Sequence, residues 1–207
     1  MKNESGAASE PVLSAEAALA EFREAGALLE GHFILTSGRR SGHYMQCARV
    51  MVDPARAERL CRALRARIRE TRPEIVVDAV VAPAMGGILV GYELARQLGT
   101  RSFFTERVEG RFALRRGFHL APGTRVLIAE DVVTTGLSLR ECADCVAALG
   151  AVPVAGACLV DRSNGKADID MPLVALVAVD FPTFAPDEIP PELAAIPPTK
   201  PGSRGLA

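Results

Sequence analysis

Apolar positions follow two alternating patterns along most of the chain. Short, nearly unbroken apolar runs predict buried β-strands, and stretches in which apolar residues recur every three or four positions predict amphipathic helices. The expected strands are residues 74–83, 101–107, 124–130, 152–162 and 172–180. The expected helices are residues 53–70, 86–99 and 138–150. Strands that alternate with helices in this way indicate an α/β fold around a mainly parallel sheet flanked by helices.

The two ends of the chain follow a less regular pattern. Residues 14–30 have helical spacing after a serine, and residues 31–50 mix β-forming residues with Ser-Gly pairs, which predicts short strands with a turn near residues 38–42. Residues 1–11 are polar and small, and the proline-rich residues 190–207 suit no regular element, so both are expected to be extended tails. Without an internal repeat or a linker, one domain over residues 1–207 is expected.

The composition limits the partners that the chain can have. The chain has 207 residues, 49% of them hydrophobic and 24% charged, which is ample for one sizeable core. A net charge of -1 gives no electrostatic case for nucleic acid or for an anionic membrane as a partner. No apolar run reaches the ~20 residues of a membrane span. The polar start "MKNESGAASEP" lacks the apolar core of a signal peptide, so a cytoplasmic location is expected.

Two further features each allow a purely structural and a functional interpretation. The five cysteines have no framework spacing and are expected to be reduced, and Cys142 and Cys145 share one face of a helix, which favours packing over a redox or zinc site. The helix at residues 53–70 carries six arginines, spread around its circumference. In a nearly neutral chain, a solvated helix surface is favoured over a stripe that binds nucleic acid.

The segment "VLIAEDVVTTGLS" (residues 126–138) carries the most specific chemical signal. It places two acids, Glu130 and Asp131, at the carboxyl end of a buried strand, where ligands bind in open α/β sheets. The small and hydroxyl residues that follow lead into a helix N-terminus, where free backbone N–H groups and the helix dipole favour a phosphate. The acids cannot bind that phosphate, but they can accept hydrogen bonds from the diol of an attached sugar. A ribose 5-phosphate site explains the whole segment, whereas a turn aspartate with a Ser138 helix cap leaves the acid pair and the Thr-Thr-Gly run unexplained.

The same segment closely resembles the phosphoribosyl-diphosphate (PRPP) signature of the type I phosphoribosyltransferases. The resemblance implies that family's fold: a mainly parallel central sheet flanked by helices, with a small N-terminal hood. The hood would comprise residues 14–50 and part of the C-terminal region, and the core residues 54–182. It also implies that Glu130 and Asp131 meet the ribose hydroxyls while the next seven residues hold the 5-phosphate. These are Val132, Val133, Thr134, Thr135, Gly136, Leu137 and Ser138.

Three other segments resemble the orotate phosphoribosyltransferases within that family. "GHFILTSGRRSGHYMQC" (31–47) is similar to their hood, "APAMGGI" (82–88) to their diphosphate loop and "LVDRSNG" (159–165) to the strand end that carries an orotate-binding arginine. The implied diphosphate-loop residues are Ala84, Met85 and Gly86. The implied orotate-binding residues are Ser37, Gly38, Tyr44, Thr134 and Arg162. A surface salt bridge is the alternative for Arg162, and a core position is the alternative for Tyr44.

Residues 106–118, "ERVEGRFALRRGF", lie where the family has its mobile catalytic loop. Where many members carry lysine or histidine, this chain has Thr36 in the hood, Gly86 in the diphosphate loop, and Arg111 and Ala113 in the catalytic loop. The loop keeps its positive charge through Arg107, Arg111, Arg115 and Arg116. Arginine never deprotonates and binds phosphate in a bidentate fork, so these residues can stabilise a departing diphosphate, unless they form only a solvated loop.

The resemblance implies an enzyme of pyrimidine synthesis that joins orotate to PRPP, with Asp131 and the four arginines in its catalytic site. Mg²⁺ is the expected cofactor, held mainly by PRPP and through water by Asp131. A homodimer is implied, with loop 106–118 reaching the neighbouring site and Gly110 and Gly117 letting it move. The alternatives are a transferase for another base and a catalytically silent PRPP-binding regulator.

Overall fold

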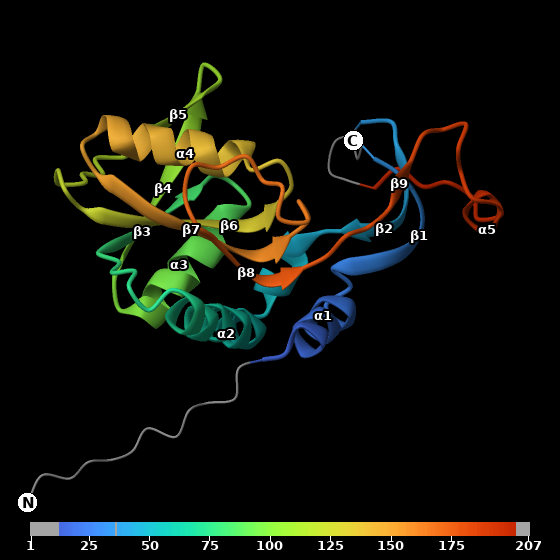
Figure 1. The fold of residues 1–207 in the computed structure, drawn as a ribbon, viewed down its shortest axis with the longest axis horizontal. Coiled ribbons are helices and arrows are strands. Elements are labelled where there is room, and N and C mark those ends of the chain that lie inside the picture. The colour runs from blue at the N-terminus through green and yellow to red at the C-terminus, as the bar shows by residue number, and fades with distance from the viewer. Residues whose placement is uncertain (1–12, 36, 202–207) are drawn as a thin grey trace, which may run out of the picture.

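The computed structural model describes residues 13–35 and 37–201, and its centre is a six-stranded sheet (Figure 1). The strand order is β5-β4-β3-β6-β7-β8, and every neighbouring pair is parallel except β4 with β5. The strands are β3 (Ala79–Pro83), β4 (Arg101–Val108), β5 (Arg111–Leu114), β6 (Arg125–Val133), β7 (Val152–Asp161) and β8 (Leu173–Ala178). The predicted α/β fold with a mainly parallel sheet is confirmed.

Helices cover both faces of this sheet (Figure 1). Side chains on alternate positions of a strand point to opposite faces. Val80 and Leu127 accordingly belong to the apolar cluster with α2 (Pro54–Thr71) and α3 (Gly87–Leu98), whereas Val81 and Ile128 belong to the cluster with α4 (Leu137–Ala148). A buried parallel sheet needs such a helix layer on each side, which is why its strands are nearly continuous apolar runs.

The helix boundaries follow ordinary capping chemistry. Helix α2 begins with Pro54 after Asp53, whose carboxylate accepts a hydrogen bond from the Ala55 N–H. Helix α3 ends at Gly99, which has a left-handed backbone, as predicted for residues 86–99. Among the described helices, none is both long enough and apolar enough to cross a membrane.

A second, three-stranded antiparallel sheet lies beside the core and forms the hood (Figure 1). Strand β1 (Leu28–Ile34) pairs with β2 (Arg40–Met45), and β2 pairs with the short β9 (Thr183–Phe184). A 3-10 helix, η1 (Cys47–Val52), leads from β2 to the core. Because β9 comes directly after the last core strand, two segments far apart in the sequence build one hood.

The N-terminal helix is shorter than predicted. Helix α1 (Ala15–Glu24) ends before Gly26, which has a φ of +61°, and residues 28–30 belong to strand β1 instead of a helix over 14–30. The buried Leu28 pairs with Met45 of β2, so tertiary pairing overrides the local helical spacing. The predicted strand 74–83 is also shorter, because β3 begins only at Ala79.

The prediction that residues 190–207 form an extended tail is wrong for the part that the structure describes. Helix α5 (Pro191–Ala194) buries Leu193, and Thr199 bridges to Phe33 of β1. The Thr199 N–H donates to the His32 carbonyl oxygen and the Ile34 N–H donates to the Thr199 carbonyl oxygen, both at 2.8 Å. Residues 202–207, the predicted tail at 1–11 and Thr36 lie outside the described residues.

The six arginines of α2 do not form one solvated surface: Arg62 and Arg69 are exposed, the other four are half-buried, and two of those four have a structural role. Arg56 and Arg59 both donate to the Glu21 carboxylate of α1 at 2.8 Å. These two guanidinium groups hold the pKa of Glu21 below its usual value, against the opposing effect of burial. These ion pairs therefore link α1 to helix α2 of the core.

Candidate functional site

Glu130 and Asp131 lie near the carboxyl end of the central strand β6. They pack against the turn between β3 and α3, where glycines allow close approach. A methyl group on Gly86 would lie 2.9 Å from Oδ1 of Asp131, and one on Gly87 would lie 3.0 Å from Oε1 of Glu130. The structure therefore brings the predicted acid pair together with the predicted diphosphate turn, which includes Ala84, Met85 and Gly86.

Burial and mutual repulsion make this acid pair difficult to ionise. Burial, and then the charge of Asp131, raise the pKa of Glu130 from 4.5 to about 9. Burial also raises the pKa of Asp131, although the Val132 N–H donates to its carboxylate at 2.8 Å and opposes the shift. At neutral pH the free protein therefore keeps a proton on Glu130, which a hydroxyl-rich or cationic ligand would help to displace.

We expect Glu130→Gln to stabilise the free protein at high pH. A carboxyl whose folded pKa is raised from 4.5 to about 9 binds its proton more tightly when folded, so its contribution is complete below pH 4.5 and is lost as pH rises towards 9. Near pH 5 the variant and the wild type should have the same free energy of unfolding. Near pH 9 the free energy of unfolding of the variant should be larger by ~2 kcal/mol, the scale of an unfavourable buried charge. Urea unfolding across this pH range measures the difference, and an equal difference at every pH would contradict the buried acid pair.

The predicted phosphate loop is shorter than residues 132–138. Val132 and Val133 continue strand β6, and Leu137 and Ser138 already belong to the first turn of α4, which leaves Thr134, Thr135 and Gly136 as the loop itself. The strand is longer than predicted because Val132 and Val133 pair with β7. Strand end, loop and helix start still line one pocket of about 170 Å³ together with Glu130.

Gly136 gives the loop its shape. Its φ of +85° is left-handed, and a methyl group there would lie 2.8 Å from Cγ2 of Ile169. Thr135 Oγ1 accepts from the Leu137 N–H at 3.3 Å. The next N–H groups of α4 have no partner within the helix, so they face the pocket as donors for an anion.

We expect Gly86→Ala to weaken PRPP binding selectively. The new methyl group must displace the Asp131 carboxylate, and misplacing one binding group should raise KM for PRPP ~10-fold and KM for the second substrate less than twofold. Gly42→Ala is the matched control, because a methyl group on Gly42 would meet only Leu193, at 4.0 Å. Steady-state kinetics on both variants measures the difference, and equal KM values for PRPP would show that Gly86 does not position Asp131.

Arg162 follows β7 and lies close to the acid pair. Its N–H donates to the Val133 carbonyl oxygen at 2.8 Å, and its guanidinium carbon lies 5.8 Å from the centre of the Phe181 ring. No carboxylate within the described residues pairs with Arg162, and its Nε is buried without a hydrogen-bond partner there. The alternative of a surface salt bridge therefore finds no support in the structure.

The hood residues predicted to bind orotate are more widely spread. Ser37 and Gly38 lie in the exposed turn between β1 and β2. Tyr44 is half-buried; its ring packs 5.7 Å from Phe33 and its hydroxyl donates to Gln46 Oε1 at 2.9 Å. Its neighbour His43, on the other face of the strand, contacts Phe181 instead.

Comparison with known proteins identifies the family. A family model described as "Phosphoribosyl transferase domain" matches residues 53–188. The orotate phosphoribosyltransferase of Maricaulis maris is 55% identical over 189 residues, which make up 91% of this chain and 97% of that protein. The orotate phosphoribosyltransferase of Erythrobacter litoralis is 57% identical over 190 residues, 91% of this chain and 97% of that protein. The chain belongs to the orotate phosphoribosyltransferases.

Solved structures of this family share the fold. Orotate phosphoribosyltransferase from Aeropyrum pernix matches with a TM-score of 0.63 at 25% identity, over 78% of this chain and 93% of that one. The Mycobacterium tuberculosis enzyme in complex with inorganic phosphate matches with a TM-score of 0.63 at 23% identity, over 79% and 94% of the two chains. These likenesses confirm the predicted type I phosphoribosyltransferase fold.

The segment that resembles the family's catalytic loop is an antiparallel hairpin in this chain. Strands β4 and β5 pair from Thr105 with Leu114 to Val108 with Arg111, and the hairpin projects beyond the rest of the sheet (Figure 1). Gly110 lies at its tip with a φ of +83° and not at a hinge, whereas Gly117 follows β5 with a φ of +72°. The predicted loop therefore has more regular structure than its glycines indicated.

The four predicted catalytic arginines fall into two pairs. Arg107 donates to Glu141 at 2.5 Å and lies 4.2 Å from the Phe112 ring centre, and Arg116 donates to Glu106 at 2.7 Å. Arg111 and Arg115 are exposed and form no ion pair within the described residues. The structure does not bring any of the four into contact with the acid pair, and it leaves Arg111 and Arg115 free to bind an anion.

Sequence reasoning did not single out three residues that the structure places where the hood meets the core: His43, Cys47 and Phe181. Cys47 is buried beside the acid pair and Arg162; burial, and then the charge of Asp131, raise the pKa of its thiol. The period of two in strand β2 could have placed His43 on the core-facing side with Ser41 and Met45. No sequence pattern links His43 to Phe181, which lies 138 positions further along the chain.

Cys142 and Cys145 pack on α4, as the sequence predicted. Cys142 is buried 3.4 Å from the Thr105 hydroxyl, and burial raises its pKa to about 12. Cys145 is half-buried on the same helix face. Within residues 13–35 and 37–201, no three His, Cys, Asp or Glu side chains gather at one point.

Proposed function

We propose that the chain transfers the 5-phosphoribosyl group of PRPP to orotate, giving orotidine 5'-phosphate and diphosphate in pyrimidine synthesis. The bond between ribose C1 and the diphosphate oxygen breaks with its electron pair on diphosphate, a bond from C1 to a ring nitrogen of orotate forms, and the proton of that nitrogen is released to water or diphosphate. The observation that carries this proposal is the contact of the Glu130–Asp131 pair with the glycine turn at residues 86–87, beside the 170 Å³ pocket at the start of α4.

Each part of PRPP has a chemically suitable partner in this site. The carboxylates of Glu130 and Asp131 accept hydrogen bonds from the ribose diol. The loop at residues 134–136 and the first turn of α4, with Leu137 and Ser138, hold the 5-phosphate with N–H and hydroxyl donors. The turn at residues 84–86 supplies backbone donors for the diphosphate. The relatives named orotate phosphoribosyltransferase, at 55% and 57% identity, support this assignment.

Arg162 is the proposed partner of the orotate carboxylate. Its guanidinium has no carboxylate partner in the described part of the chain, and a planar fork suits a bidentate contact. Thr134 reaches the base from the phosphate loop, and Ser37, Gly38 and Tyr44 belong to the hood above it. A half-buried arginine beside the ribose site favours a nucleobase that carries a carboxylate over an uncharged nucleobase.

The diphosphate leaves with a developing negative charge, and we assign its stabilisation to the hairpin arginines and to Mg²⁺. Mg²⁺ would be held mainly by PRPP, with the Asp131 carboxylate as a contact through water, and would neutralise charge on the leaving group when bound. Of the hairpin arginines, Arg111 and Arg115 are free for this role, and Arg107 and Arg116 would have to leave Glu141 and Glu106.

We further propose a homodimer in which the projecting β4–β5 hairpin reaches the partner's site, working in the cytoplasm, where its five thiols stay reduced.

The experiment is an assay of the purified protein with PRPP, Mg²⁺ and orotate, followed by the loss of orotate absorbance. Turnover of orotate that requires added Mg²⁺ is the expected result. Turnover of uracil or adenine without turnover of orotate would overturn the substrate assignment. PRPP binding with no turnover of any base would indicate a regulator. Sedimentation of the protein with and without PRPP tests the dimer separately.

A further inference from the structure

The outer face of helix α3 carries large apolar side chains. Met85, Leu89 and Tyr92 are four and three residues apart, and the Ile88 N–H donates to the Met85 carbonyl oxygen at 3.2 Å, so the helical spacing already begins at Met85. The exposed fractions of Met85, Leu89 and Tyr92 are 83%, 55% and 65%, whereas Val90 on the opposite face is fully buried. We call these three side chains the α3 stripe. No described segment of the chain covers it.

The side chains around α3 are apolar on nearly all sides, and a helix of this kind is normally buried all round. The charged residues of α3 are Glu93 and Arg96, and their side chains pair at 2.8 Å. Arg96 also pairs with Glu58 of α2 at 3.0 Å. These charges are therefore bound to one another, and they leave no strong field to attract nucleic acid, an anionic membrane or a charged peptide. The α3 stripe suits another apolar surface.

The α3 stripe begins at the diphosphate turn. Met85 follows the carboxyl end of β3, and the β4–β5 hairpin extends β4 beyond the same edge of the sheet, because β3 and β4 are parallel neighbours. Helix α3 packs on both of these strands. A partner bound to the stripe therefore lies beside the edge of the sheet that carries the acid pair, the diphosphate turn and the hairpin.

The candidate site at that edge is incomplete within one chain. Diphosphate needs cations to neutralise it, yet Arg111 and Arg115 are exposed, form no ion pair within the described residues and do not contact the acid pair. A second copy of the chain would bring the same two arginines on its own hairpin. A second copy therefore accounts both for the apolar stripe and for the missing cations.

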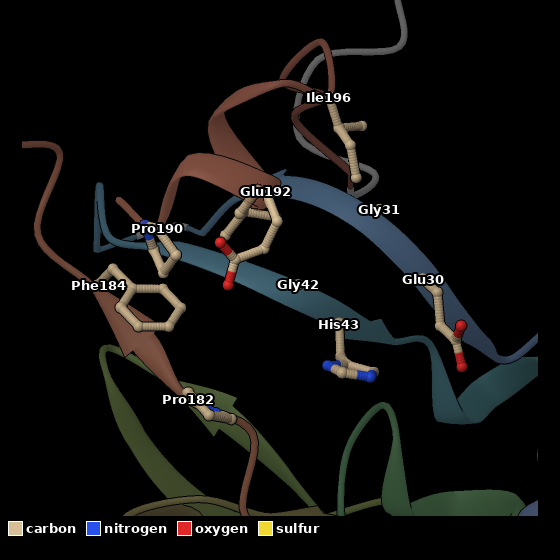
Figure 2. A pocket seen from close by; sticks show the side chains of 10 residues that line it. Glu30, Gly31, Gly42, His43, Pro182, Phe184, Pro190, Glu192 and Ile196 are labelled. Carbon is tan, nitrogen blue, oxygen red and sulfur yellow. The ribbon is translucent and has the colours of Figure 1, made fainter. Parts of the chain in front are cut away.

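The hood offers another apolar recess, a pocket of about 400 Å³ between strand β2 and helix α5 (Figure 2). Phe184 and Ile196 form part of its wall, but Glu30 and Glu192 also line it, and neither carboxylate forms an ion pair within the described residues. An apolar partner that covered them would leave two charges desolvated without a counter-ion. The α3 stripe includes no such group, so it is the better surface for a second copy.

We propose that the α3 stripe is the centre of an isologous contact between two copies of this chain, with Leu89 nearest the two-fold axis. The proposal rests on the homodimer of the proposed function, and it names the surface that forms that homodimer. Leu89 lies in the middle of the stripe, so a two-fold axis perpendicular to the helix pairs it with the partner's Leu89 and sets Met85 against the partner's Tyr92. The ion pairs of Arg96 then lie at the rim, where polar groups are usual.

The test measures the mass of Leu89→Glu, of Leu89→Lys and of an equal mixture of both by sedimentation equilibrium. Each variant alone places like charges on either side of the axis, so its dimer dissociation constant should rise by at least ~10²-fold. The mixture pairs a glutamate with a lysine across the axis and should recover most of the dimer. Ile196→Glu is the matched control, because it places the same charge on an exposed apolar side chain of the hood pocket, and its mass should equal that of the wild type.

Turnover of orotate gives an independent readout. Each Leu89 variant alone should keep its PRPP binding, for which the acid pair and phosphate loop of one chain suffice. Its kcat should fall ~10²-fold because the hairpin of the second copy is absent, and the mixture should recover kcat. Wild-type kcat in a dissociated variant would contradict the incomplete site on which the proposal rests.

A monomeric wild-type protein, or a dimer that persists in both Leu89 variants, would overturn the proposal. Dissociation of Ile196→Glu alone would assign the contact to the hood instead. Failure of the mixture to recover the dimer would contradict the position of Leu89 at the axis. Dissociation and recovery as expected, in a protein that never turns over orotate, would confirm the surface and refute the proposed function. Circular dichroism of each variant checks that the fold survives the substitution.

Discussion

Replacing Arg162 with glutamine is expected to lower kcat/KM for orotate by ~10²–10³-fold, because a charge-assisted, partly desolvated contact with a carboxylate is worth ~3–4 kcal/mol. The structure supports this size of effect. The guanidinium is half-buried, its Nε has no partner in the described part of the chain, and Phe181 packs against it. Glutamine keeps most of the side-chain volume and one donor group, but it removes the positive charge.

The loss should fall on orotate and not on PRPP, whose KM should stay within twofold. Lys166→Gln is the matched control, because it removes an exposed cation four residues further along the same segment. Its kcat/KM for orotate should equal that of the wild type. Steady-state kinetics with each substrate varied in turn measures both variants. A similar loss in Lys166→Gln would mean that orotate responds only to the overall charge of this segment.

Arg111→Gln is expected to lower kcat by ~10²-fold with PRPP binding nearly retained, the scale of removing one preorganised donor to a developing charge. Arg111 begins β5 at the tip of the projecting hairpin, and it has no ion-pair partner within the described residues. Arg107 and Arg116 already form ion pairs with Glu141 and Glu106, respectively. An unpaired guanidinium on a projecting element can meet the diphosphate without first breaking an ion pair.

Arg101→Gln is the matched control for the hairpin. It removes an exposed arginine at the start of β4, the end of that strand away from the hairpin tip, and its kcat should be unchanged. Single-turnover kinetics together with a titration of PRPP separates the chemical step from binding. Wild-type kcat in Arg111→Gln would assign the diphosphate contact to another arginine, with Arg115 as the next to test.

The core of the fold could be predicted because each of its strands and helices satisfies a local rule. Residues 126–129 are apolar and buried, and the helix at residues 86–99 ends at a left-handed glycine. The hood could be predicted only in outline. Helix α1 ends early because Leu28 pairs with Met45, and the C-terminal segment is ordered because Thr199 pairs with β1. Both contacts join distant residues, and local spacing contains no information about them.

The placement of the acid pair beside the loop that precedes α4 could be predicted, and the placement of Arg162 beside Phe181 could not. Glu130, Asp131 and the following loop are contiguous in sequence, so their chemistry is visible as one motif. Arg162, His43 and Phe181 come from three separate segments, and Phe181 contacts both of the others. Tyr44 was the predicted aromatic residue, yet strand alternation places it on the opposite face of β2 from His43.

Isothermal titration of the purified protein with PRPP and Mg²⁺, and separately with orotidine 5'-phosphate, tests the sugar-phosphate site most directly. We predict saturable heat with one site per chain for both ligands, and ~10-fold weaker PRPP binding in Gly86→Ala, in which the Asp131 carboxylate is displaced. Absence of saturable heat for both compounds, in protein whose unfolding transition shows it to be folded, would contradict the assignment of Glu130, Asp131 and the loop before α4.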